Sequence, residues 1–204
     1  MAAKSAGMPY ATNRAASSFG VPETTKSITE AVLDELAEQG YGRLSMEAVA
    51  KRAGVGKSAL YRRWPSKQDM VIAVVSEFSV PRAVDPDTGS LRGDLRETLD
   101  ALLEWLDHPR FSRILPDLAA EMARNPELGA VVEHMIGIPR RARGVEILQR
   151  AIARRELPAD LDLELALDVI AAPIYWRLSV RRGHLEPGYL DSLTDLLLRA
   201  FGAS

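Results

Sequence analysis

Apolar side chains recur at helical spacing through most of this chain. One such stripe runs from Leu91 to Leu106, and another runs from Leu190 to Phe201. Helices with an apolar stripe must pack against one another to bury it, so the pattern predicts an all-α protein. With 204 residues, the chain is long enough for one or two domains with real cores.

The first part of the chain reads as three short helices. The first is expected to end at Gly40, and the second to begin after the N-cap Ser45 and stop at Gly54. A third helix follows over residues 57–64, and Pro65 ends it because the residue before proline is disfavoured in a helix. Two short helices joined by a glycine-containing turn indicate a helix-turn-helix.

Positive charge is concentrated in this unit. Between Arg43 and Lys67 there are seven basic residues and one acid, Glu47, whereas the whole chain has a net charge of −2. A basic segment on an otherwise acidic protein suggests binding to a polyanion, with a solvated face as the alternative. Leu60 and Trp64 are expected to face inward, which turns the basic face of the third helix outward, and an α-helix fits the major groove of DNA.

Residues 26–75 carry a specific pattern of blocks and spacings: Ile28, Leu36–Tyr41, Ser45–Ala50, Ala53–Val55, Leu60–Tyr61 and Trp64–Lys67. In these blocks the chain resembles the DNA-binding domain of the TetR family of bacterial transcriptional regulators. The stretch from Asp87 to Leu95 also resembles the ligand domain of one subgroup of that family. The resemblance implies a homodimer that binds double-stranded DNA at an inverted-repeat operator.

By position, the resemblance also implies the DNA-binding residues: Ser45, Lys57, Ser58, Tyr61, Arg62, Arg63 and Lys67. Two departures from the family pattern stand out. Gly56 replaces the usual serine or threonine N-cap of the third helix, and Arg62–Arg63 stands where many members have an aromatic residue and a histidine. Whether such an arginine reads guanine or holds phosphate stays open.

A second, helical domain is expected after the linker at 81–89. We expect an interruption at Pro116, a kink or break near Gly137 and Pro139, and a kink at Pro173. The last helix has two apolar faces, so it requires its own core and another partner, which a homodimer built as a four-helix bundle supplies. A thick monomer core is the alternative. The predicted interface consists of Ile174, Leu178, Tyr189, Leu193, Leu196, Leu197 and Phe201.

The second domain is also expected to bind an unidentified small-molecule effector. Apolar and aromatic residues are the candidates for its pocket: Trp105, Phe111, Met122, Met135, Tyr175 and Trp176. Each of them also fits an ordinary core position. The cluster of Arg140, Arg141 and Arg143 is interpreted as a solvated face, with an anion site as the alternative.

Several functions are disfavoured. The chain has no cysteine, and His108, His134 and His184 lack a helical metal spacing, so neither a metal nor a cofactor is expected. The string Gly54–Ser58 resembles the end of a phosphate-binding loop, but Lys51 stands where that loop needs glycine. The longest apolar run, Met70–Val75, is far too short to cross a membrane, and residues 1–24 lack a signal-peptide core.

The sequence thus predicts three regions: a flexible arm (1–24), a helix-turn-helix DNA-binding domain with its connecting helix (25–78), and a ligand-binding and dimerisation domain (79–204). The predicted function is that of a cytoplasmic repressor released from DNA by an effector. An architectural DNA-binding protein without an effector and an all-helical enzyme are the alternatives. Lys4 and Arg14 of the arm either reach a minor groove or belong to a silent tail.

Overall fold

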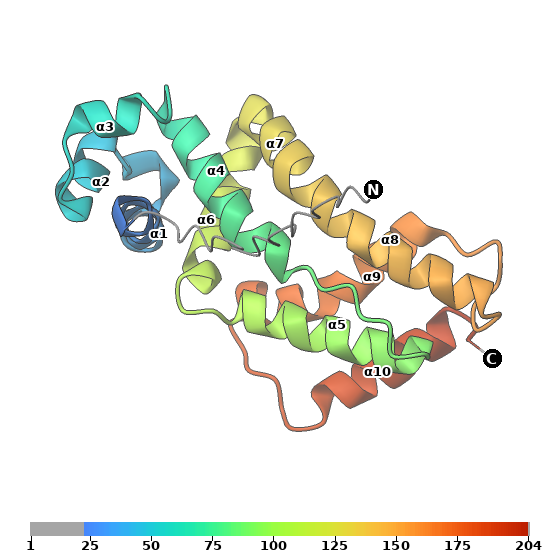
Figure 1. The fold of residues 1–204 in the computed structure, drawn as a ribbon. Helices are drawn as coiled ribbons and strands as arrows, with labels where there is room; N and C mark the ends of the chain where they lie inside the picture. Colours follow the sequence, from blue (N-terminus) through green and yellow to red (C-terminus); the bar gives the residue numbers. More distant parts are fainter. Residues whose placement is uncertain (1–22, 204) are drawn as a thin grey trace, which may run out of the picture.

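The computed structural model describes residues 23–203, and this part of the chain is helical without a strand (Figure 1). The predicted arm over residues 1–24 lies outside the described residues except for its last two, which begin the first helix. No helix of the described part is long and apolar enough to cross a bilayer. The α-helices are α1 (Glu23–Arg43), α2 (Met46–Ala53), α3 (Lys57–Tyr61), α4 (Lys67–Ser79), α5 (Leu91–Leu106), α6 (Phe111–Arg124), α7 (Pro126–Val132), α8 (Ile138–Ala153), α9 (Leu163–Tyr175) and α10 (Tyr189–Ala200).

Side-chain caps set the starts of several helices, as the sequence predicts. Each cap oxygen accepts a hydrogen bond from the backbone N–H three residues further on, at 3.0–3.2 Å. These bonds satisfy donors that a helix start leaves without an intrahelical partner. Ser45 caps α2, as predicted, and Ser66, Asn125 and Asp162 cap α4, α7 and α9.

The predicted helix breaks are mostly absent. Pro116 lies inside α6, so the predicted interruption there is absent. Pro173 lies inside α9, three residues before the helix passes into a π-helical turn. Near Gly137, α7 and α8 continue into one another through the π-helical turn η2 (Glu133–Gly137), so that Figure 1 shows a nearly unbroken rod. A second π-helical turn, η3 (Trp176–Val180), extends α9.

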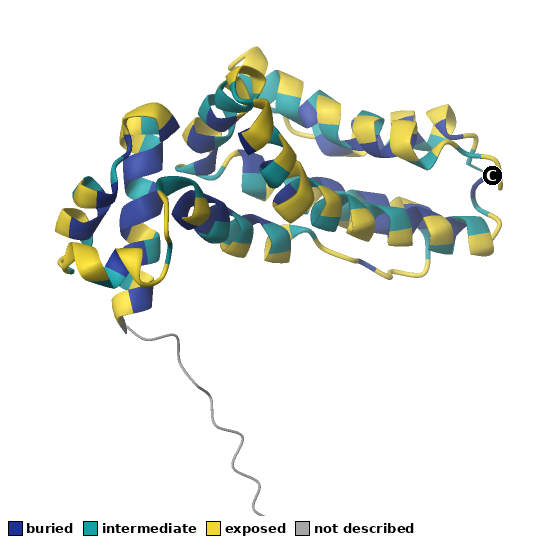
Figure 2. Ribbon diagram, turned by 90° about the horizontal axis from the view of Figure 1, so that it is seen from above, coloured by how far each residue is buried: buried dark blue, intermediate teal, exposed yellow. Residues whose placement is uncertain are grey.

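The core is divided differently from the predicted domains. One cluster of buried residues joins α1–α4 to Phe111, Ile114 and Leu118 of α6 and to α7. The other cluster unites α5, α8, α9 and α10. In Figure 2 the buried residues of both groups face neighbouring helices. The predicted DNA-binding domain therefore shares a core with two helices of the second domain.

Polar contacts reinforce this union between α1 and α6. Arg110, which precedes α6, forms ion pairs with Glu30 and Asp34 of α1 at 2.6 and 2.8 Å. Near its end, α1 is interrupted at Gly40, whose φ of 75° and ψ of 167° are not helical. Just after this bend, the Tyr41 backbone N–H donates to Asp117 of α6 at 2.7 Å.

Candidate nucleic-acid interface and ligand cavity

The turn between α2 and α3 has the local geometry of a helix-turn-helix. Gly54 ends α2 in the left-handed conformation, with φ 68° and ψ 29°, and the Val55 N–H bonds back to the Ala50 carbonyl at 3.0 Å. After Gly56, α3 begins at Lys57. Leu60 is fully buried, so it anchors the inner side of α3 and leaves the opposite side facing outward (Figure 1).

The outer side of α3 and the turn after it present unoccupied donors. Lys57, Ser58, Tyr61, Arg62 and Arg63 are exposed, and 48% of the Tyr61 surface is accessible despite its apolar ring. Arg62 and the Ser58 hydroxyl form no side-chain hydrogen bond or ion pair with any other described residue. These side chains are available to base edges and phosphates, which accept such donors.

The other predicted DNA-binding residues have partners within the chain. Lys57 pairs with Glu47 at 2.5 Å, and its hydrogen bond holds the pKa of Glu47 below the ordinary range. Arg63 donates to the Thr25 hydroxyl at 2.7 Å. Lys67 is half-buried and donates to the Tyr41 carbonyl at 2.9 Å. Lysine and arginine carry several donors each, so these contacts orient the side chains while leaving N–H groups free.

Two residues of the basic segment have mainly structural contacts. Arg52 forms ion pairs with Glu35 and Glu38 of α1 at 2.8 and 2.5 Å, which ties α2 to α1. Ser45, a predicted phosphate contact, is half-buried and caps α2. Within this segment the charge of Arg52 is therefore used inside the protein, whereas Arg43, Lys51 and Arg62 are exposed without an ion pair among the described residues.

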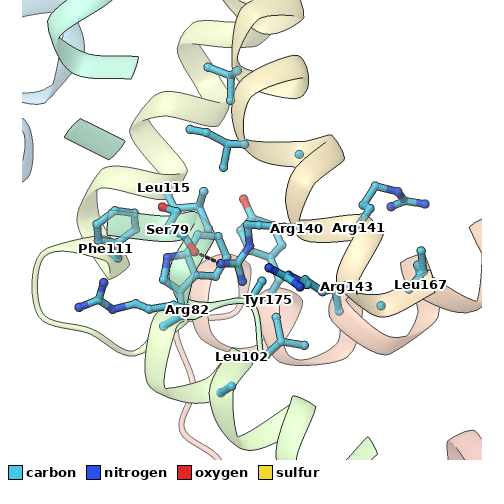
Figure 3. A pocket seen from close by; sticks show the side chains of 18 of the residues that line it. Ser79, Arg82, Leu102, Phe111, Leu115, Arg140, Arg141, Arg143, Leu167 and Tyr175 are labelled. Atoms are coloured by element: carbon cyan, nitrogen blue, oxygen red, sulfur yellow. Dashed lines mark hydrogen bonds between the residues drawn. The ribbon is translucent and has the colours of Figure 1, made fainter. Parts of the chain in front are cut away.

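A cavity of about 440 Å³ lies between the two cores. Its walls come from the end of α4 and from α5, α6, η2, α8 and α9 (Figure 3). Four of the predicted pocket residues line it: Trp105, Phe111, Met122 and Tyr175. The other two do not: Met135 and Trp176 lie on the surface, with 44% and 58% of their areas exposed.

The arginine cluster does not form a single solvated face, which corrects that interpretation. Arg140 enters the cavity, where it donates to the Ser79 backbone carbonyl and lies with its guanidinium 3.8 Å from the centre of the Trp105 ring. Burial lowers the pKa of Arg140 to about 10, so it stays charged at neutral pH. Arg141 instead pairs with Asp168 at 2.8 Å, and Arg143 is exposed.

Helical spacing contained the signal for this placement. Arg140 lies four residues after Ile136 and seven before Ile147, both buried, so all three share one face of the helical rod. Ser79, a pocket residue with no sequence signature, is the last residue of α4 and is fully buried. Its role depends on where α4 ends relative to α8, which only the fold shows.

The structure places most of the predicted interface residues inside the chain. Four of them belong to the core of α5, α8, α9 and α10: Ile174, Leu193, Leu197 and Phe201. They are covered without a partner, so they cannot form the contact surface of a dimer, and this part of the prediction is corrected. Leu178 and Tyr189 are half-buried, whereas Leu196 is 55% exposed.

An apolar stripe is nevertheless exposed on the neighbouring helix. Leu165, Trp176 and Val180 are exposed at helical spacing along α9 and η3, and Val169 between them is half-buried. Leu196 of α10 is a further exposed apolar side chain. Large apolar residues gathered on one face are typical of an interface.

The histidines do not form a metal site in the described structure, which holds no group of three or more His, Asp or Glu side chains able to bind a metal. His108 packs edge-on against Phe78, with ring centres 5.0 Å apart, and burial lowers its pKa. His134 and His184 are exposed.

Comparison with known proteins gives two family matches. Residues 28–74 match the model described as bacterial regulatory proteins of the tetR family, and residues 85–197 match a tetracyclin repressor-like C-terminal domain. An uncharacterized HTH-type transcriptional regulator, YdeS of Bacillus subtilis, is 28% identical over 87% of this chain and 88% of its own length. A DNA-binding transcriptional repressor of Mycobacteroides abscessus is 30% identical over 81% of this chain and 87% of its own.

Solved structures share the fold. The transcriptional regulator FadR of Bacillus subtilis, solved in complex with stearoyl-CoA, superposes with a TM-score of 0.70 over 87% of this chain and 97% of that one, at 19% identity.

Proposed function

Because this chain belongs to the TetR family of helix-turn-helix transcriptional regulators, we propose that it is a repressor that binds an inverted-repeat operator and is released by a small-molecule effector. DNA binding and transcription regulation follow from the family itself. The family is not enzymatic, which decides against the all-helical enzyme. The proposed place of action is the cytoplasm, where the DNA of a bacterial cell lies.

The recognition surface supports operator binding. Leu60 fixes α3 against the core, while Ser58, Tyr61 and Arg62 extend from it without partners among the described residues. In the proposed complex α3 enters the major groove, Arg62 contacts bases or phosphates there, and Ser45 and Lys67 hold phosphate beside it. The observation that carries this proposal is the combination of a buried anchor with free donors on the opposite side of one short helix.

A second copy of the chain supplies the second recognition helix. Successive major grooves on one side of DNA are roughly 34–36 Å apart, so an inverted repeat requires two recognition helices. We assign the interface to the exposed apolar residues Leu165, Trp176, Val180 and Leu196. Contact with the same residues of another copy would remove these side chains from water.

The cavity supports control by an effector. Ser79, the last residue of α4, lines the cavity. The apolar side of α4 packs into the same core as α1–α3. A ligand that favours one position of α4 would change the spacing of the two recognition helices and so their fit to the operator. The M. abscessus relative is named a repressor, and the FadR structure contains stearoyl-CoA, which supports the proposed mode of action.

The test of DNA binding is selection of duplexes from a random pool, repeated at low and near-physiological salt. We expect one palindromic motif that survives the higher salt, since specific contacts outlast the salt-sensitive phosphate term. Tyr61→Ala combined with Arg62→Ala should abolish specific binding without changing the helical content. Arg124→Ala, which removes an exposed charge from α6, is the control.

Two outcomes would contradict the proposal. Recovery of unselected DNA, lost as salt rises, would favour the architectural protein. If the double variant retained specific affinity, α3 would not be the recognition helix.

A further inference from the structure

At one corner of the cavity the guanidinium of Arg140 has no acidic partner among the described residues. Arg140 of α8 points into it beside Ser79 of α4, as Figure 3 shows. The Ser79 hydroxyl is buried without a hydrogen-bond partner, and so is the indole N–H of Trp105 from α5. Arg140 itself bonds only to the Ser79 backbone carbonyl and stacks on Trp105.

This arrangement is costly in the free protein. Buried donors are normally paired, and a buried charge normally has a counter-charge. No ion pair joins Arg140 to a carboxylate in the part of the chain that the structure describes. The cavity lining includes one acid, Glu133, and its carboxylate lies against Gly137 instead. The Arg140 charge thus borders a space that the protein does not fill, whereas the Ser79 hydroxyl and the Trp105 N–H are enclosed by protein atoms.

The rest of the cavity is apolar. Its lining includes Leu102, Leu115, Leu118, Ile147 and Ile170, and the volume of about 440 Å³ falls in the usual range of small-molecule sites. A ligand matched to these walls combines an apolar body with one polar group that accepts hydrogen bonds. Exposed Arg82 and Arg143 also line the cavity and would attract an anion towards it.

We propose that this corner binds the carboxylate of an amphipathic organic acid, whose apolar body occupies the remainder of the cavity. The inference rests on the proposed function in taking the cavity as the effector site. A planar carboxylate fits the fork of a guanidinium, and its single negative charge balances the one buried positive charge.

The same corner connects the ligand to α4. Guanidinium has five N–H donors, so Arg140 can hold a carboxylate and the Ser79 carbonyl together. A carboxylate held by Arg140 is thereby linked to the backbone of the residue that ends α4. Carboxylate binding therefore fixes the end of α4 against α8, which links the chemistry of the ligand to the position of the DNA-binding helices.

The test measures binding to the full-length protein without DNA, by isothermal titration calorimetry. The probes are matched sets with one apolar body each: decanoate, decanamide and decylamine, and naphthoate, naphthamide and naphthylmethylamine. At least one carboxylate should bind tenfold or more tightly than its amide, and the amines should bind most weakly. Arg140→Met should remove this preference, whereas Arg143→Met should preserve it to within about threefold.

Ser79→Ala should leave carboxylate binding within about threefold of the wild type, because the Ser79 hydroxyl is enclosed and Arg140 bonds to the backbone carbonyl that alanine retains. The wild-type preference alone decides the ligand class, even if Arg140→Met folds poorly. The proposal would be overturned if amides or amines bound as well as the carboxylates, or if neither carboxylate bound. It would also be overturned if a folded Arg140→Met protein still preferred carboxylates to amides. Carboxylate binding that depends on Arg140 but leaves operator affinity unchanged would instead refute effector control while the anion site stands.

Discussion

Replacing Gly40 by alanine is a direct test of the contact between the DNA-binding helices and α6. Gly40 has φ 75° and ψ 167°, a region that is essentially restricted to glycine. Its bend presents the Tyr41 N–H to Asp117 at 2.7 Å. A Cβ added at Gly40 would lie 2.7 Å from the Asp117 Oδ1 atom, closer than real Cβ contacts allow. Alanine therefore strains the backbone and displaces the carboxylate that Tyr41 binds.

The expected cost is the sum of two effects. Holding a non-glycine residue in this conformation costs about 1–3 kcal/mol. Disturbing a hydrogen bond to a charged acceptor costs about 1.5–3 kcal/mol. We expect Gly40→Ala to lower the free energy of unfolding by about 3–5 kcal/mol, and for a chain of this size the melting temperature falls by roughly 10 °C.

Urea unfolding followed by circular dichroism, at one protein concentration, measures this change. Gly42→Ala is the control, since a Cβ there meets nothing within 4 Å and its φ is ordinary. That variant should be unchanged or about 0.5 kcal/mol more stable. In an Asp117→Ala background, Gly40→Ala should cost only the backbone strain. Equal stability of the two alanine variants would refute the reasoning, as would an identical cost in both backgrounds.

Two other predictions concern the core of α5, α8, α9 and α10 and its exposed surface. Trp176→Glu combined with Leu196→Glu, which changes two exposed apolar residues, should give a monomer by sedimentation with unchanged helical content. Leu193→Glu should instead unfold the protein, because only 5% of Leu193 is exposed. A folded Leu193→Glu protein or a dimeric double variant would contradict the assigned interface. Asp94→Asn should lower the free energy of unfolding at neutral pH by about 2 kcal/mol, because the buried carboxylate loses its bond to Arg154 at 2.9 Å. Burial alone would raise the pKa of Asp94, but the hydrogen bonds to its carboxylate outweigh burial and lower the pKa. The stabilisation is therefore fully present above the unfolded-state pKa of about 4, and it is lost as the pH falls through the folded-state pKa. Urea titrations over that range should show the two proteins converging in acid, and a constant difference would count against it.

Features with local causes could be predicted from the sequence. The caps Ser45, Ser66, Asn125 and Asp162 bond to backbone groups three residues away, so their chemistry is contained in a few consecutive residues. The turn at Gly54 has the same character. The outward side of α3 followed from one buried anchor, Leu60.

Features that depend on which face meets which neighbour could not be predicted. The two apolar faces of α10 are similar in sequence, yet Leu193 is buried by the same chain and Leu196 is exposed. The burial of Arg140 arises because α8 is placed against the end of α4, which no local pattern specifies. Pro116 misled because α6 continues through it, although proline lacks the backbone donor that a helix interior normally uses.

In the proposed mechanism, the position of the cavity between two cores would let a site remote from α3 control that helix. Through Met70, Val71 and Val74, α4 is packed into the core of the DNA-binding helices and moves with them. Its last residue, Ser79, is held by Arg140, which belongs to α8 and hence to the opposite side of the cavity. Interiors are densely packed and transmit displacement, so a ligand between the cores changes the relation of two rigid groups instead of deforming either one. Only a ligand that binds one such arrangement more tightly shifts the equilibrium, and in the proposed site a carboxylate would do so through Arg140, which bonds to the end of α4.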